Sequence, residues 1–150
     1  AGIDKKTAMS YVEILEKAFI VFRLRPFSRN LRKEINKMHK IFFYDNGVRN
    51  ALVNNFNPTS LRNDRGQIWE NFVISERQKK QYWAGNSLNN YFWRTYDQQE
   101  IDLIEEKNGK LFAFEIKWKK ERKFSPKIWQ KTYPNSVWQP INKDNFLDFV

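Results

Sequence analysis

The sequence predicts a mixed α/β fold, of the α+β type, whose core has the order α-β-β-β-α-β. Apolar residues recur at helical spacing from residue 64 to residue 80, and three segments typical of β-strands follow them. Asn108-Gly109 separates the last two segments and is the strongest short-range signal for a β-hairpin. We therefore expect a long helix over 64–80 and three strands over 91–96, 100–106 and 110–118.

The chain after the third strand predicts the rest of this core. Ser125-Pro126 is a typical helix start, because a capping residue is followed by a proline whose fixed φ suits the first helical turn. We expect this helix to end near residue 131. A short strand over 136–138 and a closing helix over 142–150 complete the predicted order.

The first 52 residues predict a smaller unit in front of the core. Helical spacing and capping, strand composition and turn residues indicate its elements in order: a helix over 7–18 with Thr7 as N-cap, strands over 19–24 and 41–44, and a turn at 45–47. A basic loop separates the two strands. One helix and two strands around such a loop resemble the back half of a winged-helix module.

A linker is expected between this unit and the core. Residues 53–63 are rich in Asn, Pro and Ser, which favour turns and irregular backbone over helices or strands. The predicted organisation is therefore a partial winged-helix-like segment with its connector over 1–52, a linker over 53–63 and the main domain over 64–150.

Composition restricts the function classes. The chain has 150 residues, and its 27 Lys and Arg against 17 Asp and Glu give a formal charge of +10, which favours a polyanionic partner such as nucleic acid or an anionic membrane surface. The absence of cysteine excludes disulfides, thiol nucleophiles and cysteine-based zinc sites. His39 is the single histidine, so no serine triad, zinc triad or histidine-based nuclease motif can be assembled.

The same sequence favours a cytoplasmic protein without a membrane partner. No apolar run approaches the roughly 18 residues of a spanning helix, and the N-terminus lacks the pattern of a signal peptide. The chain begins at Ala1 and enters a predicted helix almost at once, so we expect it to be a fragment of a longer polypeptide.

Three charged residues of the predicted hairpin are expected to converge. Residues two apart in a strand share a face, so Glu115 and Lys117 point the same way. If Asn108 and Gly109 are the two turn residues, Asp102 lies opposite Glu115 on the neighbouring strand. Two carboxylates and one ammonium group then meet on one face of the sheet.

Such a group of side chains suits metal-dependent phosphodiester hydrolysis. Mg²⁺ prefers carboxylate oxygens and retained waters, and a bound cation lowers the pKa of water and shields phosphate charge. A lysine beside the metal can orient that water or stabilise the charge that develops on phosphorus. We expect Asp102 and Glu115 to bind Mg²⁺ or Mn²⁺, with Lys117 beside them.

The hairpin sequence resembles a known family. Glu-Ile-Asp-Leu-Ile over 100–104, followed by Phe-Glu-Ile-Lys over 114–117, is similar to the Asp…Glu-x-Lys signature of PD-(D/E)XK nucleases, including their Holliday-junction-resolvase-like branch. The resemblance implies an α-β-β-β-α-β core. It also implies that Asp102, Glu115 and Lys117 are catalytic. The first helix of that family often supplies a further acidic residue, which here corresponds to Glu70, with Glu76 as the alternative if it is not paired elsewhere.

A second resemblance covers nearly the whole chain. Its motifs are Thr7…Tyr11…Leu15, Lys-Ile-Phe-Phe-Tyr-Asp-Asn-Gly over 40–47, Trp-Glu-Asn-Phe-Val over 69–73 and the hairpin itself. In this order they are similar to the C-terminal domain that follows a winged-helix segment in a prokaryotic family of AAA+-like ATPases. The resemblance implies an N-terminal ATPase module of the same polypeptide as partner. None of the five glycines begins a phosphate-binding loop, so we expect no ATP binding by this chain.

Several features of the sequence allow two interpretations each. The hairpin carboxylates form either a nuclease-like site or an exposed sheet face with cross-strand ion pairs, and Glu70 is either a site residue or a solvated helix residue. The basic residues between Arg23 and Lys40 either contact DNA or dock the ATPase. A basic run after the third strand either contacts nucleic-acid phosphates or forms a solvated loop; its members are Lys119, Lys120, Arg122 and Lys123.

Two functions are consistent with this sequence. The favoured one is an accessory domain that gives an AAA+-like ATPase its target or its nucleic-acid contact. The alternative is an active Mg²⁺-dependent DNA endonuclease of the resolvase type, in which Glu70 assists Asp102, Glu115 and Lys117. Both interpretations keep DNA as a candidate partner.

Overall fold

The computed structural model describes residues 2–29, 38–86, 88–119 and 125–150. Its helices are α1 (Lys5–Lys17), α2 (Asn46–Leu52), α3 (Arg65–Trp83), α4 (Lys127–Thr132) and α5 (Phe146–Phe149), with a short 3-10 helix η1 (Thr59–Leu61). Its strands are β1 (Val21–Pro26), β2 (Lys40–Phe43), β3 (Asn89–Arg94), β4 (Glu100–Lys107), β5 (Lys110–Ile116) and β6 (Val137–Ile141). From α3 to β6 the order is α-β-β-β-α-β, as predicted, and the fold class is mixed α/β.

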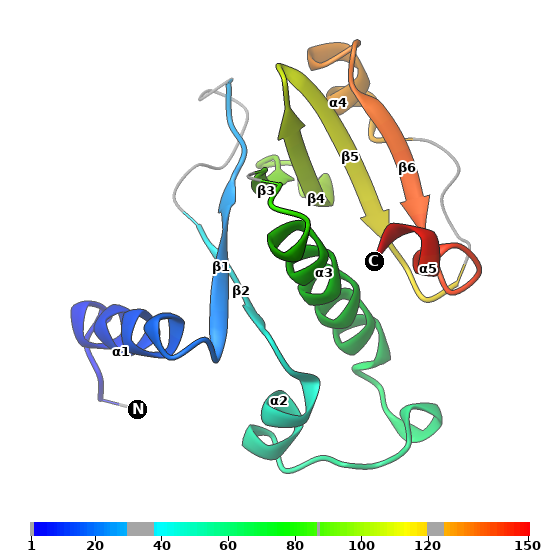
Figure 1. The fold of residues 1–150 in the computed structure, drawn as a ribbon. Coiled ribbons are helices and arrows are strands. Elements are labelled where there is room, and N and C mark those ends of the chain that lie inside the picture. The colour runs from blue at the N-terminus through cyan, green and yellow to red at the C-terminus, as the bar shows by residue number, and fades with distance from the viewer. Residues whose placement is uncertain (1, 30–37, 87, 120–124) are drawn as a thin grey trace.

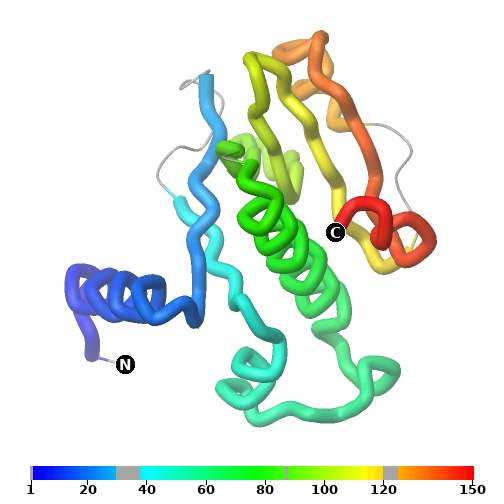
Figure 2. The backbone as a smooth tube through the Cα atoms, viewed as in Figure 1, coloured from blue at the N-terminus to red at the C-terminus, as the bar shows by residue number. Residues whose placement is uncertain are grey.

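These strands form one sheet in the order β2-β1-β3-β4-β5-β6 (Figure 1). β1 runs parallel to β3 and β5 runs parallel to β6, whereas the other neighbours are antiparallel. The strands before the predicted linker therefore extend the same sheet that the later strands build. In the tube view, β1 and β2 lie side by side on the side of the molecule that carries α1 and α2 (Figure 2).

The sheet separates two apolar clusters. On one face, α3 and α5 pack against the central strands, and this cluster includes Val73, Leu103, Phe114 and Phe149. On the other face, α4 and the residues after β1 form a second cluster; its buried members are Phe27, Trp93, Ile101, Ile104, Leu111, Ala113, Trp129 and Tyr133. Leu103 and Ile104 lie next to each other in β4 and belong to different clusters, as the alternation of a strand requires.

A β-bulge changes this alternation in the middle of β4. Tyr91 pairs with Ile104 and Trp93 pairs with Ile101, so β4 uses one residue more than β3 over the same length. Ile101 consequently lies in the α4 cluster, while Leu103 faces α3. Ile101 and Leu103, two residues apart in one strand, therefore lie on different faces, which simple alternation does not anticipate.

Two local predictions near the N-terminus were also wrong. The first helix is capped by Asp4, not by Thr7, because the Asp4 carboxylate accepts hydrogen bonds from the backbone N–H groups of Lys6 (2.8 Å) and Thr7 (3.0 Å). The predicted turn at 45–47 is the start of α2. Asp45 acts as its N-cap, since its side chain accepts a hydrogen bond from Val48 N (3.1 Å).

The predicted linker connects α2 and α3 outside the sheet, and it is anchored by a buried arginine. Arg62 donates to both carboxylate oxygens of Asp64 (2.8 and 2.9 Å) and to the carbonyl of Asn55. The pKa of Asp64 is held well below its ordinary range by these arginine contacts. None of the helices in the described part of the chain is long and apolar enough to cross a membrane.

Candidate functional site

The β4–β5 hairpin has the predicted register. Asn108 and Gly109 both have positive φ (51° and 74°), which the two central residues of a type I′ turn require. The pairs run from Lys107 with Lys110 to Leu103 with Phe114, in line with that turn. The ladder ends one step before Asp102 and Glu115.

Asp102, Glu115 and Lys117 meet at this end of the hairpin. The Lys117 ammonium lies 3.3 Å from Asp102 Oδ2 and 3.1 Å from Glu115 Oε1. Asp102 Oδ2 also accepts a hydrogen bond from the backbone N–H of Ile116 (2.8 Å). Both carboxylate residues are 4 % exposed, so their charges depend on nearby cationic and N–H groups.

Two further carboxylates join this group through a lysine from β2. Lys40 Nζ lies 2.9 Å from Glu70 Oε1 on α3, forms an ion pair with Glu100, and lies 3.8 Å from Asp102 Oδ1. Its ammonium group is 5.6 Å from the centre of the Phe92 ring, so the side chain reaches over β3 to the end of β4. We call these four carboxylates and two lysines the carboxylate cluster: Glu70, Glu100, Asp102, Glu115, Lys40 and Lys117.

A buried asparagine helps to place Lys40 beside Glu70. Asn71 accepts a hydrogen bond from Phe43 N (2.8 Å) and donates one to Phe43 O (2.9 Å). These two bonds pair the C-terminal end of β2 with α3 as a neighbouring strand would. Because Asn71 follows Glu70 directly, the same contact brings the Glu70 carboxylate within reach of Lys40.

The electrostatics of the cluster follow from its burial and its charges. Burial acts to lower the pKa of Lys40, but the carboxylates of Glu70, Asp102 and Glu100 outweigh it and raise that pKa above its ordinary value. The pKa of Lys117 is raised in the same way, because Asp102 and Glu115 outweigh its desolvation.

The pKa of Glu70 shows that bringing the acids together is unfavourable for their charged forms. Burial and then the neighbouring charge of Asp102 raise the pKa of Glu70, and Lys40 offsets only part of this effect. Lys40 and Lys117 are therefore needed to keep four carboxylates in one place.

The cluster does not fit a divalent ion in this arrangement. In the described part of the chain, no three or more His, Cys, Asp or Glu side chains are grouped so that they could hold a metal. The Lys40 ammonium stands among Glu70, Glu100 and Asp102, where a shared cation would have to be. The predicted ligands Asp102 and Glu115 are bridged by Lys117.

Other predicted residues have different positions. Glu76 lies in α3 and pairs with Lys79 one turn away (2.6 Å). It is therefore paired outside the cluster and is not one of the site residues. Lys119 is exposed just beyond the cluster. Lys120, Arg122 and Lys123 lie outside the described residues, and the proposed nucleic-acid contact of this basic run stays a prediction.

Sequence reasoning missed Lys40 and Glu100 as members of the cluster. Glu100 could have been found, because it is two residues from Asp102 in the same strand. Lys40 carries no comparable signal, since its position depends on the parallel pairing of β1 with β3 and on the contact between β2 and α3. Both are long-range features that no local pattern encodes.

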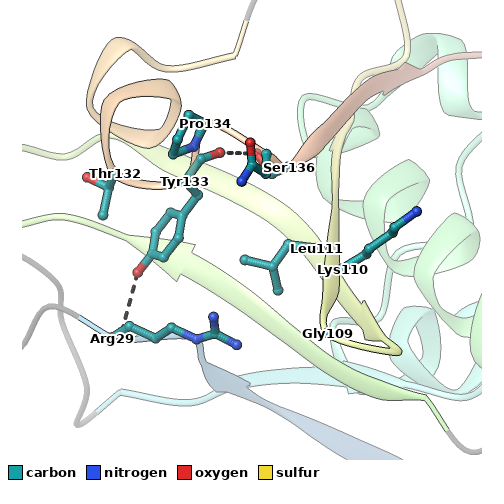
Figure 3. A pocket seen from close by; sticks show the side chains of 9 residues that line it. Arg29, Gly109, Lys110, Leu111, Thr132, Tyr133, Pro134 and Ser136 are labelled. Carbon is teal, nitrogen blue, oxygen red and sulfur yellow. Dashed lines mark hydrogen bonds between the residues drawn. The ribbon is translucent and has the colours of Figure 1, made fainter.

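A pocket at the other end of the hairpin has no acidic side chain among the described residues that line it. A hollow of about 450 Å³ lies beside the turn, between the end of β1 and α4 (Figure 3). There the Tyr133 hydroxyl accepts a hydrogen bond from Arg29 N (3.3 Å). A smaller pocket of about 240 Å³ is lined by Lys40 and Glu70, and it adjoins the carboxylate cluster.

Two protein families match different parts of the chain. Residues 65–135 match a family described as a domain of unknown function (DUF4143), which in general is a C-terminal domain of AAA-ATPase-like proteins. Residues 1–59 match a second family described as a domain of unknown function (DUF8612). No solved structure matches the chain.

Two curated proteins from mycobacteria are similar to the chain. The uncharacterized protein Rv2008c of Mycobacterium tuberculosis (strain ATCC 25618 / H37Rv) is 34% identical over 117 residues. The uncharacterized protein Mb2031c of Mycobacterium bovis (strain ATCC BAA-935 / AF2122/97) has the same identity over the same length. Each match covers 77% of this chain and 26% of the relative, so the chain spans about a quarter of these proteins.

Proposed function

We propose that this chain is the C-terminal accessory part of an AAA-ATPase-like protein, and that it gives the ATPase its contact with a target without cutting that target. The match of residues 65–135 supports the ATPase context. The element order from α3 to β6 and the converging hairpin residues support a nuclease-like fold of the PD-(D/E)XK kind.

The position of Lys40 is the observation that favours a non-cutting domain. Hydrolysis of a phosphodiester by carboxylates relies on a cation that shields the phosphate and activates water. Here an ammonium group lies among three of the acids, and it cannot bind and polarise a water as a Lewis acid. The cluster holds four carboxylates against two ammonium groups, and this excess of negative charge opposes the approach of a phosphate backbone.

The net charge of the chain outside the cluster supports nucleic acid as the target. The formal charge of the chain is +10 although the cluster itself carries more carboxylates than lysines, so the positive charge is concentrated outside it. Phosphate contacts from lysine and arginine side chains are strong at low salt and independent of sequence. Lys119, an exposed lysine two residues after Lys117, is a described candidate for such a contact.

The second candidate is a Mg²⁺- or Mn²⁺-dependent nuclease. It is favoured by the 3.1 and 3.3 Å distances that join Lys117 to Glu115 and Asp102. In that function Asp102 and Glu115 would hold the metal, Glu70 would assist, and Lys117 would orient water or stabilise charge on phosphorus. Metal binding would first require Lys117 to leave its position between Asp102 and Glu115, and Lys40 to move away from Asp102 Oδ1.

Metal titration and cleavage separate these candidates. The 150-residue chain is titrated with MgCl2 and MnCl2 in a calorimeter, and it is incubated with branched, single-stranded and duplex DNA in the same buffers. Asp102→Ala and Lys117→Ala are compared with Glu76→Ala, which removes an acid of α3 outside the cluster. We expect no saturable metal binding and the same background cleavage from every protein. Saturable binding that Asp102→Ala abolishes, with cleavage that Lys117→Ala abolishes, would establish the nuclease instead.

Target contact is measured by fluorescence anisotropy with labelled single-stranded and duplex DNA. We expect affinity to fall steeply between about 50 and 200 mM salt, because the contact depends on phosphate charge. Lys119→Glu should weaken binding, whereas Lys5→Glu on α1 serves as a control of equal charge change. Equal binding by both variants would remove Lys119 from the proposed contact.

A further inference from the structure

Lys40 lies on an edge strand, but its ammonium group contacts acids on other elements. β2 is separated from β4 by β1 and β3 in the sheet, yet Lys40 Nζ reaches acids on α3 and β4. Its side chain is 23 % exposed, so most of the stem and part of the charge are removed from water. A buried lysine of this kind is costly unless its charge is matched by partners.

We propose that Lys40 supplies the counter-charge of the carboxylate cluster in place of a divalent cation, so that the chain folds and keeps its acids together without a metal. This inference rests on the proposed non-cutting function and names the residue that maintains it.

The geometry of the ammonium group suits this role. A lysine ammonium has three N–H donors and no acceptor, and three carboxylates surround Lys40 Nζ. Without it, Glu70, Glu100 and Asp102 would face one another in a partly buried site, where like charges repel more strongly than in water. The contacts of Lys40 remove this repulsion.

Asp102 shows why a metal and Lys40 exclude each other. Its Oδ1 faces Lys40 at 3.8 Å, while its Oδ2 accepts from Ile116 N at 2.8 Å and lies 3.3 Å from Lys117. Each oxygen of this central acid is therefore next to an ammonium group. A divalent ion bound at about 2.0–2.6 Å from such oxygens would lie against the Lys40 charge, so the lysine must leave before the ion can bind.

Removing the lysine should therefore create a response to metal. Thermal unfolding of the 150-residue chain is followed in EDTA and in MnCl2, for the unmodified chain, for Lys40→Ala and for Lys79→Ala. Lys79 also pairs with a glutamate of α3, but outside the cluster, and it is the matched control. We expect Mn²⁺ to leave the midpoints of the unmodified chain and of Lys79→Ala unchanged. At ten times the dissociation constant, it should raise that of Lys40→Ala by about 3–6 °C.

A second variant keeps the test decisive if Lys40→Ala does not fold in EDTA. Lys40→Ala combined with Glu100→Gln removes one negative charge together with the positive one, so it should fold more readily in EDTA and show a smaller Mn²⁺ shift. Refolding of Lys40→Ala that depends on Mn²⁺ would also support the proposal.

Two results would overturn the proposed role of Lys40. Only the first of them would also overturn the non-cutting function. A Mn²⁺ shift in the unmodified chain equal to that of Lys40→Ala would remove both the role of Lys40 and the non-cutting function. No response to Mn²⁺ in any variant, folded or refolded, would remove the role of Lys40 and leave the accessory function intact.

Discussion

At the scale of single residues, each lysine of the carboxylate cluster stabilises acids that come from a different part of the chain. Lys117 bridges Asp102 and Glu115, and Lys40 bridges Glu70 with the acids of β4. Removing one partner from such a group leaves a partly buried charge without a counter-charge. The resulting loss of stability is larger than the stability that the ion pair adds over apolar side chains at the same positions. The two lysines therefore affect stability before they affect any chemistry.

Alkaline pH should reveal the contribution of Lys40. Its pKa in the folded protein lies above the ordinary value of 10.5, so the folded state keeps the proton after the unfolded chain has released it. The stabilisation is complete below that ordinary value and is lost as pH rises through the folded-state pKa. We expect the free energy of unfolding to fall more steeply above pH 10.5 in the unmodified chain than in Lys40→Met.

Urea unfolding at a series of pH values measures this difference, with Lys79→Met as the control. Lys79→Met should keep the alkaline slope of the unmodified chain. The same slope in Lys40→Met would mean that the folded protein does not hold the Lys40 proton more tightly than the unfolded chain does.

The sequence could predict those residues of the cluster that a local hairpin brings together. Asp102, Glu115 and Lys117 follow from strand alternation and from one tight turn. In the structure, the Lys117 ammonium lies 3.3 Å from Asp102 Oδ2 and 3.1 Å from Glu115 Oε1. Lys40 could not be predicted, because it joins the cluster only after β1 pairs with β3 and Asn71 pairs with the end of β2.

At the scale of elements, the hairpin turn sets the register that places the acids. Gly109 has φ of +74°, and no heavy atom beyond its chain neighbours lies within 4 Å of a Cβ built on it. Gly109→Ala should therefore destabilise the protein through backbone conformation, by about 1–2 kcal/mol, and not through a clash. Gly66→Ala is the matched control, since Gly66 also has open space around it but no positive φ.

Chemical denaturation compares these two variants. Gly66 lies in the first turn of α3, so replacement by alanine should be neutral or stabilising by up to about 1 kcal/mol. Equal free energies of unfolding for the two variants would show that the turn does not constrain the hairpin as its backbone angles indicate.

The elements themselves were largely predictable, with two instructive exceptions. The long helix and the strands of the core begin and end within a few residues of their predicted bounds, because periodicity and turn residues are local signals. Asp-Asn-Gly over 45–47 satisfies the rules for a turn and for a helix start alike, and packing against α3 selects the helix. The bulge in β4 arises from pairing with β3, which the β4 sequence does not specify.

At the scale of the whole molecule, the first third of the chain is part of the architecture of the core. β1 pairs with β3, and β2 brings Lys40 to the carboxylate cluster. The two family matches meet between residues 59 and 65, yet the sheet continues across that boundary. We infer that the two segments fold as one unit.

A truncation tests this inference. A fragment of residues 64–150 loses the strand that covers β3 and the lysine that neutralises Glu70, so we expect it to lack a cooperative unfolding transition. Deletion of residues 1–17 is the control, because α1 buries none of its residues. The control should keep a cooperative transition, measured by circular dichroism during heating. Cooperative unfolding of the 64–150 fragment would instead support two independent domains.

The most direct test of the account is a crystal structure of the chain grown with MnCl2 and measured at a wavelength where manganese scatters anomalously. The account predicts an ammonium group from Lys40 among Glu70, Glu100 and Asp102, with no anomalous peak beside them. A manganese peak coordinated at about 2.1 Å by Asp102 and Glu115, with Lys40 turned away, would contradict it.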